Sequence, residues 1–333
     1  MSKAQPEFER DISVIICTRN RAAQLGAVLT SMVEMVKPAG IDWEICIVDN
    51  GSTDHTAEVV ESFAGRLPIR RVREDLAGLS NARNRGVAEA TGRYLCWTDD
   101  DVLVDPQWLA AYAAAFEQFP TAAIFGGRIL PSLEPPTPAW FAENAGEWPL
   151  TSLLAARDLG DETTPLSFEG DKVPWGANFA VRAEEQRRCL YDPRLGVSPN
   201  QKRLGEETEV MYRLFQQGAE GRWVPGAKVH HIIPQRRQSY DYVHEYFFAM
   251  GETLAYLESV SPGDNHMRPD PATPSPVAGS DWLLHRRRAM AWLRYAAARS
   301  SGSPLGVVRA LRQIGLFGGA LAFRRAQAVS GRA

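Results

Sequence analysis

The stretch YLCWTDDDV, residues 94–102, ends a short apolar run with three aspartates in succession. Like charges held this close repel and raise each other's pKa unless a cation is present. If the strand continues, alternating side chains place Asp99 and Asp101 on one side, which makes them the better ligand pair, with Asp100 facing elsewhere. Carboxylate oxygens suit Mg²⁺ or Mn²⁺, which also bind phosphate. The alternative is a helix cap, because a helix is expected to begin near Asp105.

Apolar runs alternate with helical patterns before this stretch. Strands are expected over residues 11–18, 43–50, 69–74 and 94–99, and helices over 22–36, from Ser52 or Asp54 onward, and over 80–90. This alternation predicts an α/β fold, Rossmann-like, with a mostly parallel central sheet and helices on both faces. Ligands of such sheets bind beyond the carboxyl ends of the strands. Thr18, Asp49 and the three aspartates are therefore expected to line one crevice.

The second half of the chain has a less regular pattern. Residues 131–174 are rich in proline and predict a long surface connection, after which four segments regain a pattern. We expect a strand and a helix over 173–185, a helix over 204–218, a pair of strands over 221–233 and a helix over 240–258. The predicted organisation is a domain over 1–258 with a donor-binding half (11–130) and an acceptor half (131–258), a Pro-rich linker (259–280) and an Arg-rich helical tail (281–333).

Composition excludes some classes of protein. The net charge of −3 and the 44% hydrophobic content are typical of a soluble protein and give no case for nucleic-acid binding. The four cysteines lack metal-ligand spacing and no signal peptide is evident, so a cytoplasmic location is expected. Arg309 and Arg312 interrupt the most apolar part of the tail, so no membrane-spanning segment is expected.

Six blocks follow one another along the chain. They are VIICTRNR, CIVDNGSTD, AGLSNARNRG, YLCWTDDDV, WGANFAVRAE and GEETEV. In this order they resemble the family 2 glycosyltransferases of the GT-A fold, over roughly residues 12–233, about two thirds of the chain. The resemblance implies an inverting enzyme that moves a sugar from a nucleoside diphosphate to an acceptor hydroxyl. It also implies a divalent cation, Mn²⁺ or Mg²⁺, held at a DxD motif.

The resemblance gives donor-binding roles to eight residues. They are Thr18, Asn20, Asp49, Arg83, Asp99, Asp100, Trp175 and Asn178. Asp49 is expected near the base, where a carboxylate can accept the N3–H of uracil or thymine, and Arg83 near the base or the diphosphate. Trp175 and Asn178 match the floor beside the donor sugar and acceptor. The plainer alternatives are a turn and helix start for Asp49, a solvated helix arginine for Arg83 and a core aromatic for Trp175.

The resemblance also assigns the metal and the base. Asp101 and Asp99 match the metal-binding pair, with Asp101 the more direct ligand, and a histidine near the metal is matched by His230 in preference to His231. The expected base is the second acid of GEETEV, which is Glu207 where the family has aspartate, with Glu206 as the alternative. The two glutamates point about 100° apart on a helix, so one of them can face the acceptor.

The expected donor is UDP-sugar or dTDP-sugar, and the expected acceptor is a glycan or a lipid-linked molecule of bacterial polysaccharide or glycan synthesis. Two other functions stay open. A nucleotidyltransferase also uses an α/β sheet and acidic ligands, but residues 17–26 lack the glycine-rich turn that it would show. A non-catalytic nucleotide-sugar-binding or scaffold subunit has Glu207 in its favour. The sequence does not name the sugar, the acceptor or the linkage.

Charge is unevenly distributed along the chain. Residues 281–333 contain ten arginines and one aspartate, a net of +9, so the first 280 residues carry −12. Apolar residues mixed with arginines are typical of membrane-surface helices, which anionic lipids attract. The tail therefore predicts peripheral docking on the inner face of the cytoplasmic membrane. The alternative is packing against the acidic body or against a second subunit in a homodimer.

Overall fold

The computed structural model describes residues 8–261 and 275–330, and these form two compact units. Unit 1 contains Met1–Leu130, Arg157–Asn200 and Glu206–Ile232, and unit 2 contains Pro131–Ala156, Gln201–Gly205 and Ile233–Ala333. The units are built from interleaved segments, and the domain divisions at residues 130 and 258 stay sequence-based predictions.

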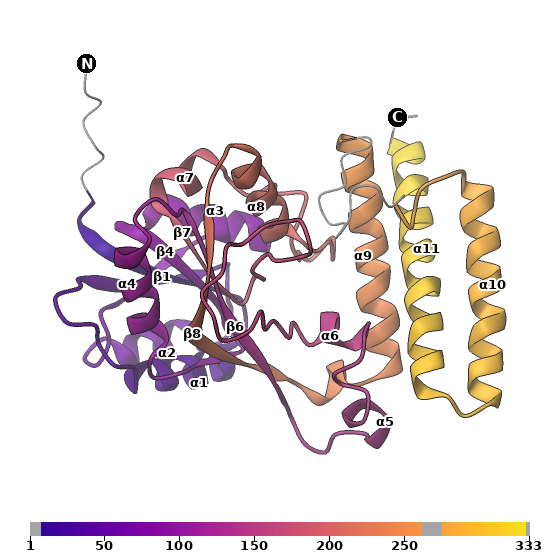
Figure 1. The fold of residues 1–333 in the computed structure, drawn as a ribbon, viewed down its shortest axis with the longest axis horizontal. Helices are drawn as coiled ribbons and strands as arrows, with labels where there is room; N and C mark the ends of the chain where they lie inside the picture. Colours follow the sequence, from indigo (N-terminus) through magenta and orange to yellow (C-terminus); the bar gives the residue numbers. More distant parts are fainter. Residues whose placement is uncertain (1–7, 262–274, 331–333) are drawn as a thin grey trace. The chain divides into compact units, whose positions relative to one another are not determined.

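Unit 1 is organised around a mixed sheet (Figure 1). Its strands run in the order β3-β2-β1-β4-β7-β6-β8-β5. The strands are β1 (Arg10–Thr18), β2 (Trp43–Asp49), β3 (Ile69–Arg73), β4 (Gly92–Asp99), β5 (Val102–Val104), β6 (Ile124–Leu133), β7 (Asn178–Arg182) and β8 (Gly221–Ile233). Strands β3, β2, β1 and β4 are parallel, whereas β7 is antiparallel to both β4 and β6. The expected α/β fold is confirmed, with an antiparallel half added to it.

Helices cover both faces of this sheet, which explains why its central strands are apolar throughout. The helices of unit 1 are α1 (Ala22–Val33), α2 (Thr56–Phe63), α3 (Leu79–Glu89), α4 (Trp108–Gln118), α7 (Ala183–Arg188) and α8 (Glu206–Gln216). Ile12, Val14 and Ile16 of β1 pack in one core with residues of α1, α2 and α4. Ile15 packs in the other core with residues of α3, α7 and α8. Burial on both faces removes the polar alternation of a half-exposed strand.

The pair of strands predicted over residues 221–233 is wrong. These residues form one strand, β8, and its later part pairs with β5 through the partners Val104–Val229, Leu103–His230 and Val102–His231. A Pro-Gly pair such as Pro225 and Gly226 usually favours a turn, yet no turn interrupts the strand here. A proline removes a single ladder donor, and here the strand continues on both sides of it.

Unit 2 contains the three long helices α9 (Tyr240–Val260), α10 (Asp281–Ser300) and α11 (Pro304–Ser330), with the short α5 (Ala139–Ala142), α6 (Leu150–Leu153) and η1 (Gln235–Arg237). The predicted C-terminal helical extension is confirmed. Helix α11 packs closely on α9, because a Cβ at Gly251 would collide with the Leu316 carbonyl and one at Gly319 with the Phe248 carbonyl. Glycine at these positions lets the two backbones approach.

The described residues bear on two predictions about the end of the chain. Of the predicted linker, residues 262–274 lie outside the described part; α9 extends to Val260, and α10 begins after Ser280, whose hydroxyl caps it by accepting from the Leu283 amide. Contrary to expectation, one helix of the described residues, Pro304–Ser330, is long and apolar enough to cross a membrane by length and composition. Of its most apolar 18-residue window, 67% is buried, as in the core helix of a bundle.

Candidate active site at the carboxyl ends of the strands

The three aspartates form a turn between β4 and β5. Strand β4 ends at Asp99, and the chain turns at Asp100 and Asp101, so strand alternation does not set their directions. Asp100 and Asp101 are buried, whereas the Asp99 side chain is 36% exposed. The guanidinium of Arg21 forms an ion pair with Asp100 through Nη1 and with Asp101 Oδ2 through Nη2, at 3.1 Å. Arg21 therefore neutralises much of the negative charge of the three successive aspartates.

Thr18 and Asp100, both expected to contact the donor, bind each other. The Thr18 hydroxyl donates to Asp100 Oδ2 at 2.8 Å, and both residues are buried. Burial and the neighbouring Asp101 raise the pKa of Asp100 to about 6, against the opposing effects of Arg21 and Thr18. In this structure the pair joins the end of β1 to the aspartate turn.

His231, rather than the preferred His230, lies beside the aspartate turn. His231 Nε2 is 3.6 Å from Asp101 Oδ1 and its side chain is buried, whereas His230 is exposed. Neighbouring residues of a strand point to opposite faces, so β8 can direct one of the two toward Asp101. The register with β5, which pairs His231 with Val102, decides that it is His231.

The donors at this turn suit a hard divalent cation. Asp101 presents Oδ1 toward His231, while its Oδ2 is taken by Arg21, and Asp99 lies close enough for its charge to interact with both. Partial burial and the charge of Asp101 raise the pKa of Asp99, against the opposing charge of Arg83, and a cation would relieve the repulsion between the two carboxylates. No group of three potential ligands gathers at metal-binding distance within residues 8–261 and 275–330. Mg²⁺ commonly takes one or two carboxylates and completes its shell with substrate phosphates and water, so the residues fit it.

Arg83 is a buried arginine at the centre of the site, and the solvated-arginine alternative is wrong. Its guanidinium lies over the rings of Trp97, Phe179 and Tyr191 at 5.5 to 5.6 Å. Burial alone would lower the pKa of Arg83, but nearby acids, Glu206 first, raise it above its ordinary value. Nη1 is buried and has no hydrogen-bond partner among the described residues. A buried donor without an acceptor points to a missing ligand or water.

Arg83 joins the aspartate turn to the acidic start of α8. Its Nη2 lies 3.6 Å from Asp99 Oδ1 and its Nε lies 3.4 Å from Glu206 Oε1. Glu207 also lies near Arg83, since a Cβ at Gly176 would be 3.2 Å from both Arg83 Nη2 and Glu207 Oε1. Glycine at 176 therefore leaves space for these two side chains to meet.

The two candidate bases differ in environment. Glu206 is buried, and burial together with the charge of Glu207 raises its pKa well above that of an ordinary glutamate, to about 8. One guanidinium cannot neutralise Asp99, Glu206 and Glu207 together, so burial favours the protonated form of Glu206. Glu207 is half-buried and closer to solvent. Glu206 is therefore the buried partner of Arg83, and Glu207 is the more accessible carboxylate.

Asp49 and Asn20 hold the loops that follow β1 and β2. Asp49 is buried, and its two oxygens accept from the Ser52 amide and from Arg71 Nη1, each at 2.8 Å. Asn20, at a positive φ of 52°, accepts from the Thr53 amide at 2.7 Å. These contacts match the turn and helix-start alternative for Asp49. They leave its contact with a base as a prediction.

Asn178 lies in the core of the fold, and Trp175 packs partly against that core. Asn178 is fully buried: its Oδ1 accepts from Trp108 Nε1 and Tyr112 Oη, and its Nδ2 donates to two backbone carbonyls. All of its hydrogen-bonding capacity is used within the fold, so its assignment to the donor floor is corrected. Trp175 is partly buried against the core, with the Arg157 guanidinium 5.0 Å from its ring centre.

Several residues of the site were not singled out from the sequence. Arg21 follows the first polar strand end, a position that could have marked it, and Arg71 pairs with Ile47 in the β2–β3 register beside Asp49. Asn50 donates to the Glu74 and Leu76 carbonyls and accepts from the Gly78 amide, which shapes the loop before α3. The partners of these residues are distant in sequence, so no local pattern shows what they contact.

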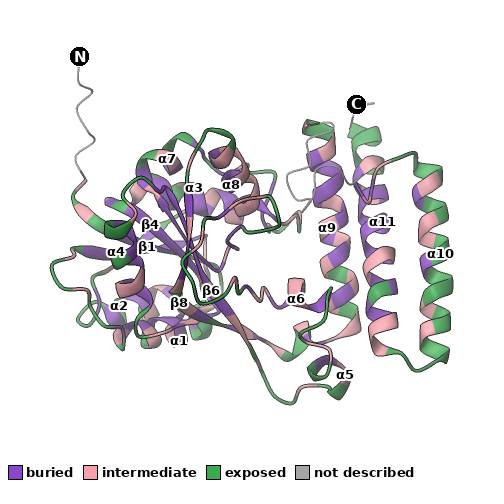
Figure 2. Ribbon diagram, in the orientation of Figure 1, coloured by how far each residue is buried: buried purple, intermediate pink, exposed green. Residues whose placement is uncertain are grey.

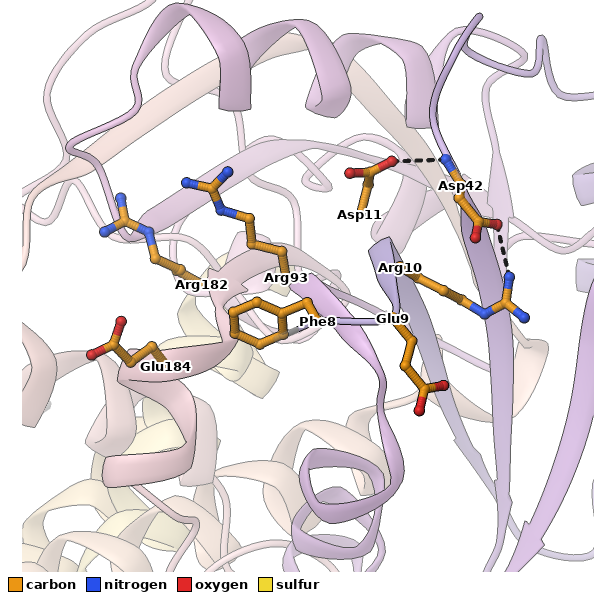
Figure 3. A pocket seen from close by; sticks show the side chains of 8 residues that line it. All are labelled: Phe8, Glu9, Arg10, Asp11, Asp42, Arg93, Arg182 and Glu184. Atoms are coloured by element: carbon orange, nitrogen blue, oxygen red, sulfur yellow. Dashed lines mark hydrogen bonds and ion pairs between the residues drawn. The ribbon is translucent and has the colours of Figure 1, made fainter. Parts of the chain in front are cut away.

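A pocket of about 360 Å³ lies at the opposite edge of the sheet, where β1 and β4 begin (Figure 3). It is lined by Phe8, Glu9, Arg10, Asp11, Asp42, Arg93, Arg182 and Glu184. Asp42 accepts from Arg10 there, and its amide donates to Asp11. Charges of both signs offset one another in this pocket, and none of the predicted site residues lines it.

The chain resembles known proteins in both sequence and structure. A family model described as glycosyl transferase family 2 matches residues 13–179. A PGL/p-HBAD biosynthesis glycosyltransferase of Mycobacterium bovis is 39% identical over 191 residues, which cover 55% of this chain and 71% of the relative. A validoxylamine A glucosyltransferase of Streptomyces hygroscopicus is 40% identical over 106 residues, 31% of this chain and 25% of that protein.

Fold similarity extends over nearly the whole chain. The mannosyltransferase PcManGT of Pyrobaculum calidifontis, solved with GDP-Man and Mn²⁺, has a TM-score of 0.60 at 18% identity and covers 98% of this chain and 91% of its own. The chain spans 23% to 35% of the length of four longer curated relatives that it matches. With a GT-A fold and the family match over half its length, the chain belongs to glycosyl transferase family 2.

Proposed function

We propose that the chain transfers a sugar from a nucleoside diphosphate to an acceptor hydroxyl by direct displacement, with inversion at the anomeric carbon. The observation that carries this proposal is Arg83, buried between Asp99 and the acids of α8, with Nη1 lacking a protein acceptor. A diphosphate oxygen would supply that acceptor, and a guanidinium binds it strongly. Arg83 then stabilises the negative charge that develops on the leaving nucleoside diphosphate.

The nucleoside of the donor is proposed to lie beside the loops that Asp49 and Asn20 hold. We expect UDP or dTDP, because an acidic or amide oxygen in these loops can accept the N3–H of a pyrimidine base. Each oxygen of Asp49 already accepts one hydrogen bond, and a carboxylate oxygen has a second lone pair. Asn20 is exposed, and its side chain lies between the two loops.

A divalent cation, Mn²⁺ or Mg²⁺, is proposed to be held by Asp101 and His231, with Asp99 beside them. When bound, the cation would neutralise charge on the two phosphates and so assist departure of the leaving group. The role of Arg21 is to hold Asp101 through its other oxygen, which fixes Oδ1 toward His231. A carboxylate positioned in this way loses little entropy when an ion binds.

The general base is proposed to be Glu207, which accepts the proton of the acceptor hydroxyl as the new bond forms. Glu207 is the more accessible of the two acids and lies beside Gly176 and Arg83. Glu206 is the positioning residue, because its buried carboxyl faces Arg83 Nε at 3.4 Å. In this arrangement Arg83 connects the base to the leaving-group end of the site.

The acceptor is proposed to be a glycan or a lipid-linked molecule of bacterial polysaccharide or glycan synthesis. The names of the two relatives described above point to different products, so they narrow the reaction and not the acceptor. Family membership favours transfer over nucleotidyl transfer. The non-catalytic alternative rests on Glu207 in place of aspartate, and a turnover assay distinguishes a non-catalytic subunit from an active transferase.

Calorimetric titration of UDP, dTDP and GDP, with and without Mn²⁺, tests the donor site directly. One nucleotide is expected to bind in a metal-dependent manner, and Asp101→Ala is expected to remove that dependence. Asp42→Ala is a matched control, because Asp42 is exposed at the opposite edge of the sheet. Absence of binding by all three nucleotides, with correctly folded protein, would contradict the proposal.

A further inference from the structure

Helix α10 presents apolar side chains to solvent along its outer face. Leu284 and Ala291 are its buried residues, whereas Trp282 is 69% exposed, Leu293 64% and Met290 46%. Successive residues of a helix advance by about 100°, so Trp282, Leu293 and Met290 fall within an arc of about 80° on the side opposite Leu284 and Ala291. Figure 2 shows this helix exposed or half-exposed along most of its length.

This arrangement differs from that of an ordinary surface helix, whose single apolar stripe faces the core. The two buried residues of α10 supply that stripe against α11, and a second apolar surface remains without a protein partner among the described residues. Exposed apolar patches of this kind mark interaction sites. A fourth large side chain, Trp292, is 48% exposed and lies outside this arc, about 80° from Trp282 around the helix.

Basic side chains border the apolar face. Residues 281–300 contain five arginines and one acid, Asp281. Arg286 lies within the apolar arc, with its guanidinium 5.8 Å from the Trp282 ring centre. Arg294 is exposed at the edge of the arc, where its Nη1 donates to Gln313 Oε1 of α11 at 2.7 Å. Arginine can keep its charge among lipid phosphates while its methylenes cover apolar surface, and tryptophan favours the headgroup level of a bilayer.

We propose that the outer face of α10 docks flat on a membrane surface that carries anionic lipid headgroups. Trp282, Leu293 and Met290 would enter the boundary of the acyl chains, and Arg286 and Arg294 would pair with lipid phosphates. A symmetric contact with a second copy of the chain is disfavoured, because it would bring this basic helix against its own copy. The proposal concerns α10 and not α11, whose apolar residues pack inside the bundle.

Vesicle sedimentation with the full chain tests the surface, and it reads binding independently of sugar transfer. The vesicles are pure phosphatidylcholine and phosphatidylcholine with about one third phosphatidylglycerol. The wild type is expected to sediment with the anionic vesicles and not with the pure phosphatidylcholine vesicles. The bound fraction should be smaller at high salt. Arg286→Gln with Arg294→Gln should lower the partition coefficient about thirty-fold. Trp282→Ser with Leu293→Ser should lower it at least about tenfold.

Two control variants change exposed residues elsewhere, Val36→Ser for the apolar change and Arg66→Gln for the charge. Both should bind anionic vesicles as the wild type does, and circular dichroism should show that all variants are folded. Equal vesicle binding by the α10 variants and the wild type would overturn the proposal. The proposal would also be overturned if the wild type failed to bind vesicles and sedimentation equilibrium showed a dimer that Trp282→Ser with Leu293→Ser dissociates. The occupant of the apolar face would then be a second copy of the chain.

Discussion

The Nε of Arg83 lies 3.4 Å from Glu206 Oε1, and both side chains are buried although they come from α3 and α8. The same guanidinium reaches Asp99 at 3.6 Å through Nη2. A single guanidinium therefore connects the end of strand β4 with the acids proposed to activate the acceptor.

Arg83→Lys is expected to lower kcat/KM by about 10²-fold, because an ammonium cannot reach the diphosphate and Glu206 together. Steady-state kinetics with saturating Mn²⁺ measures the effect. Arg85→Lys is the control, since Arg85 is on the same helix and its side chain is 44% exposed in an ion pair with Glu89. Unchanged kcat/KM in Arg83→Lys would remove Arg83 from the transfer step.

Glu207→Gln is expected to lower kcat by about 10²-fold or more while donor affinity changes little, because the amide cannot accept the acceptor proton. Glu206→Gln keeps shape and a carbonyl toward Arg83, so its kcat should fall less than that of Glu207→Gln. Nucleoside diphosphate release in the presence of acceptor reports both. The reverse order of the two variants would assign the base to Glu206.

Glu206 should make stability depend on pH. Its folded pKa is raised, so the native state binds the proton more tightly than the unfolded chain, and stability is greatest at low pH and falls as pH rises from about 4.5 to about 8. The contribution is at most about 1.4 kcal/mol per pH unit. Urea denaturation across this range should show a smaller decline in Glu206→Gln. Parallel curves for the wild type and the variant would mean that Glu206 is ionised when folded.

His231→Ala is expected to weaken Mn²⁺-dependent nucleotide binding about 10- to 100-fold, because it removes a nitrogen that faces Asp101 Oδ1 at 3.6 Å. His230→Ala is the matched control, as it changes the neighbouring exposed residue of the same strand. Calorimetry with and without Mn²⁺ compares them. If His230→Ala produced the larger loss, the register-based assignment would be wrong.

Asn178→Ala is expected to destabilise the fold by roughly 3–5 kcal/mol, because it leaves two buried side-chain donors and two buried carbonyls without their partner. Thermal or urea denaturation measures the loss. Asn20→Ala, at an exposed loop, should cost about 1 kcal/mol or less. A variant of normal stability with weakened donor binding would restore Asn178 to the donor floor.

The alternation of buried strands and helices was readable from residue order, because a strand covered on both faces must be apolar throughout. The boundaries of β1 and β2 are close to those predicted. The pair of strands predicted over residues 221–233 is instead the single strand β8, whose later part pairs with β5. A local sequence pattern does not show which distant strand a segment will pair with.

By itself the sequence determined the α/β class, the family resemblance and the edge of the sheet that carries the polar side chains, since strand direction follows from the order of elements. Tertiary structure decided which of these side chains remain available. Arg21 takes up charge at the aspartate turn, Asn178 is used by the core, and β8 turns His231 toward Asp101. Each outcome depends on a partner far away in the sequence, and free energy of burial and pairing is set by such partners rather than by neighbours along the chain.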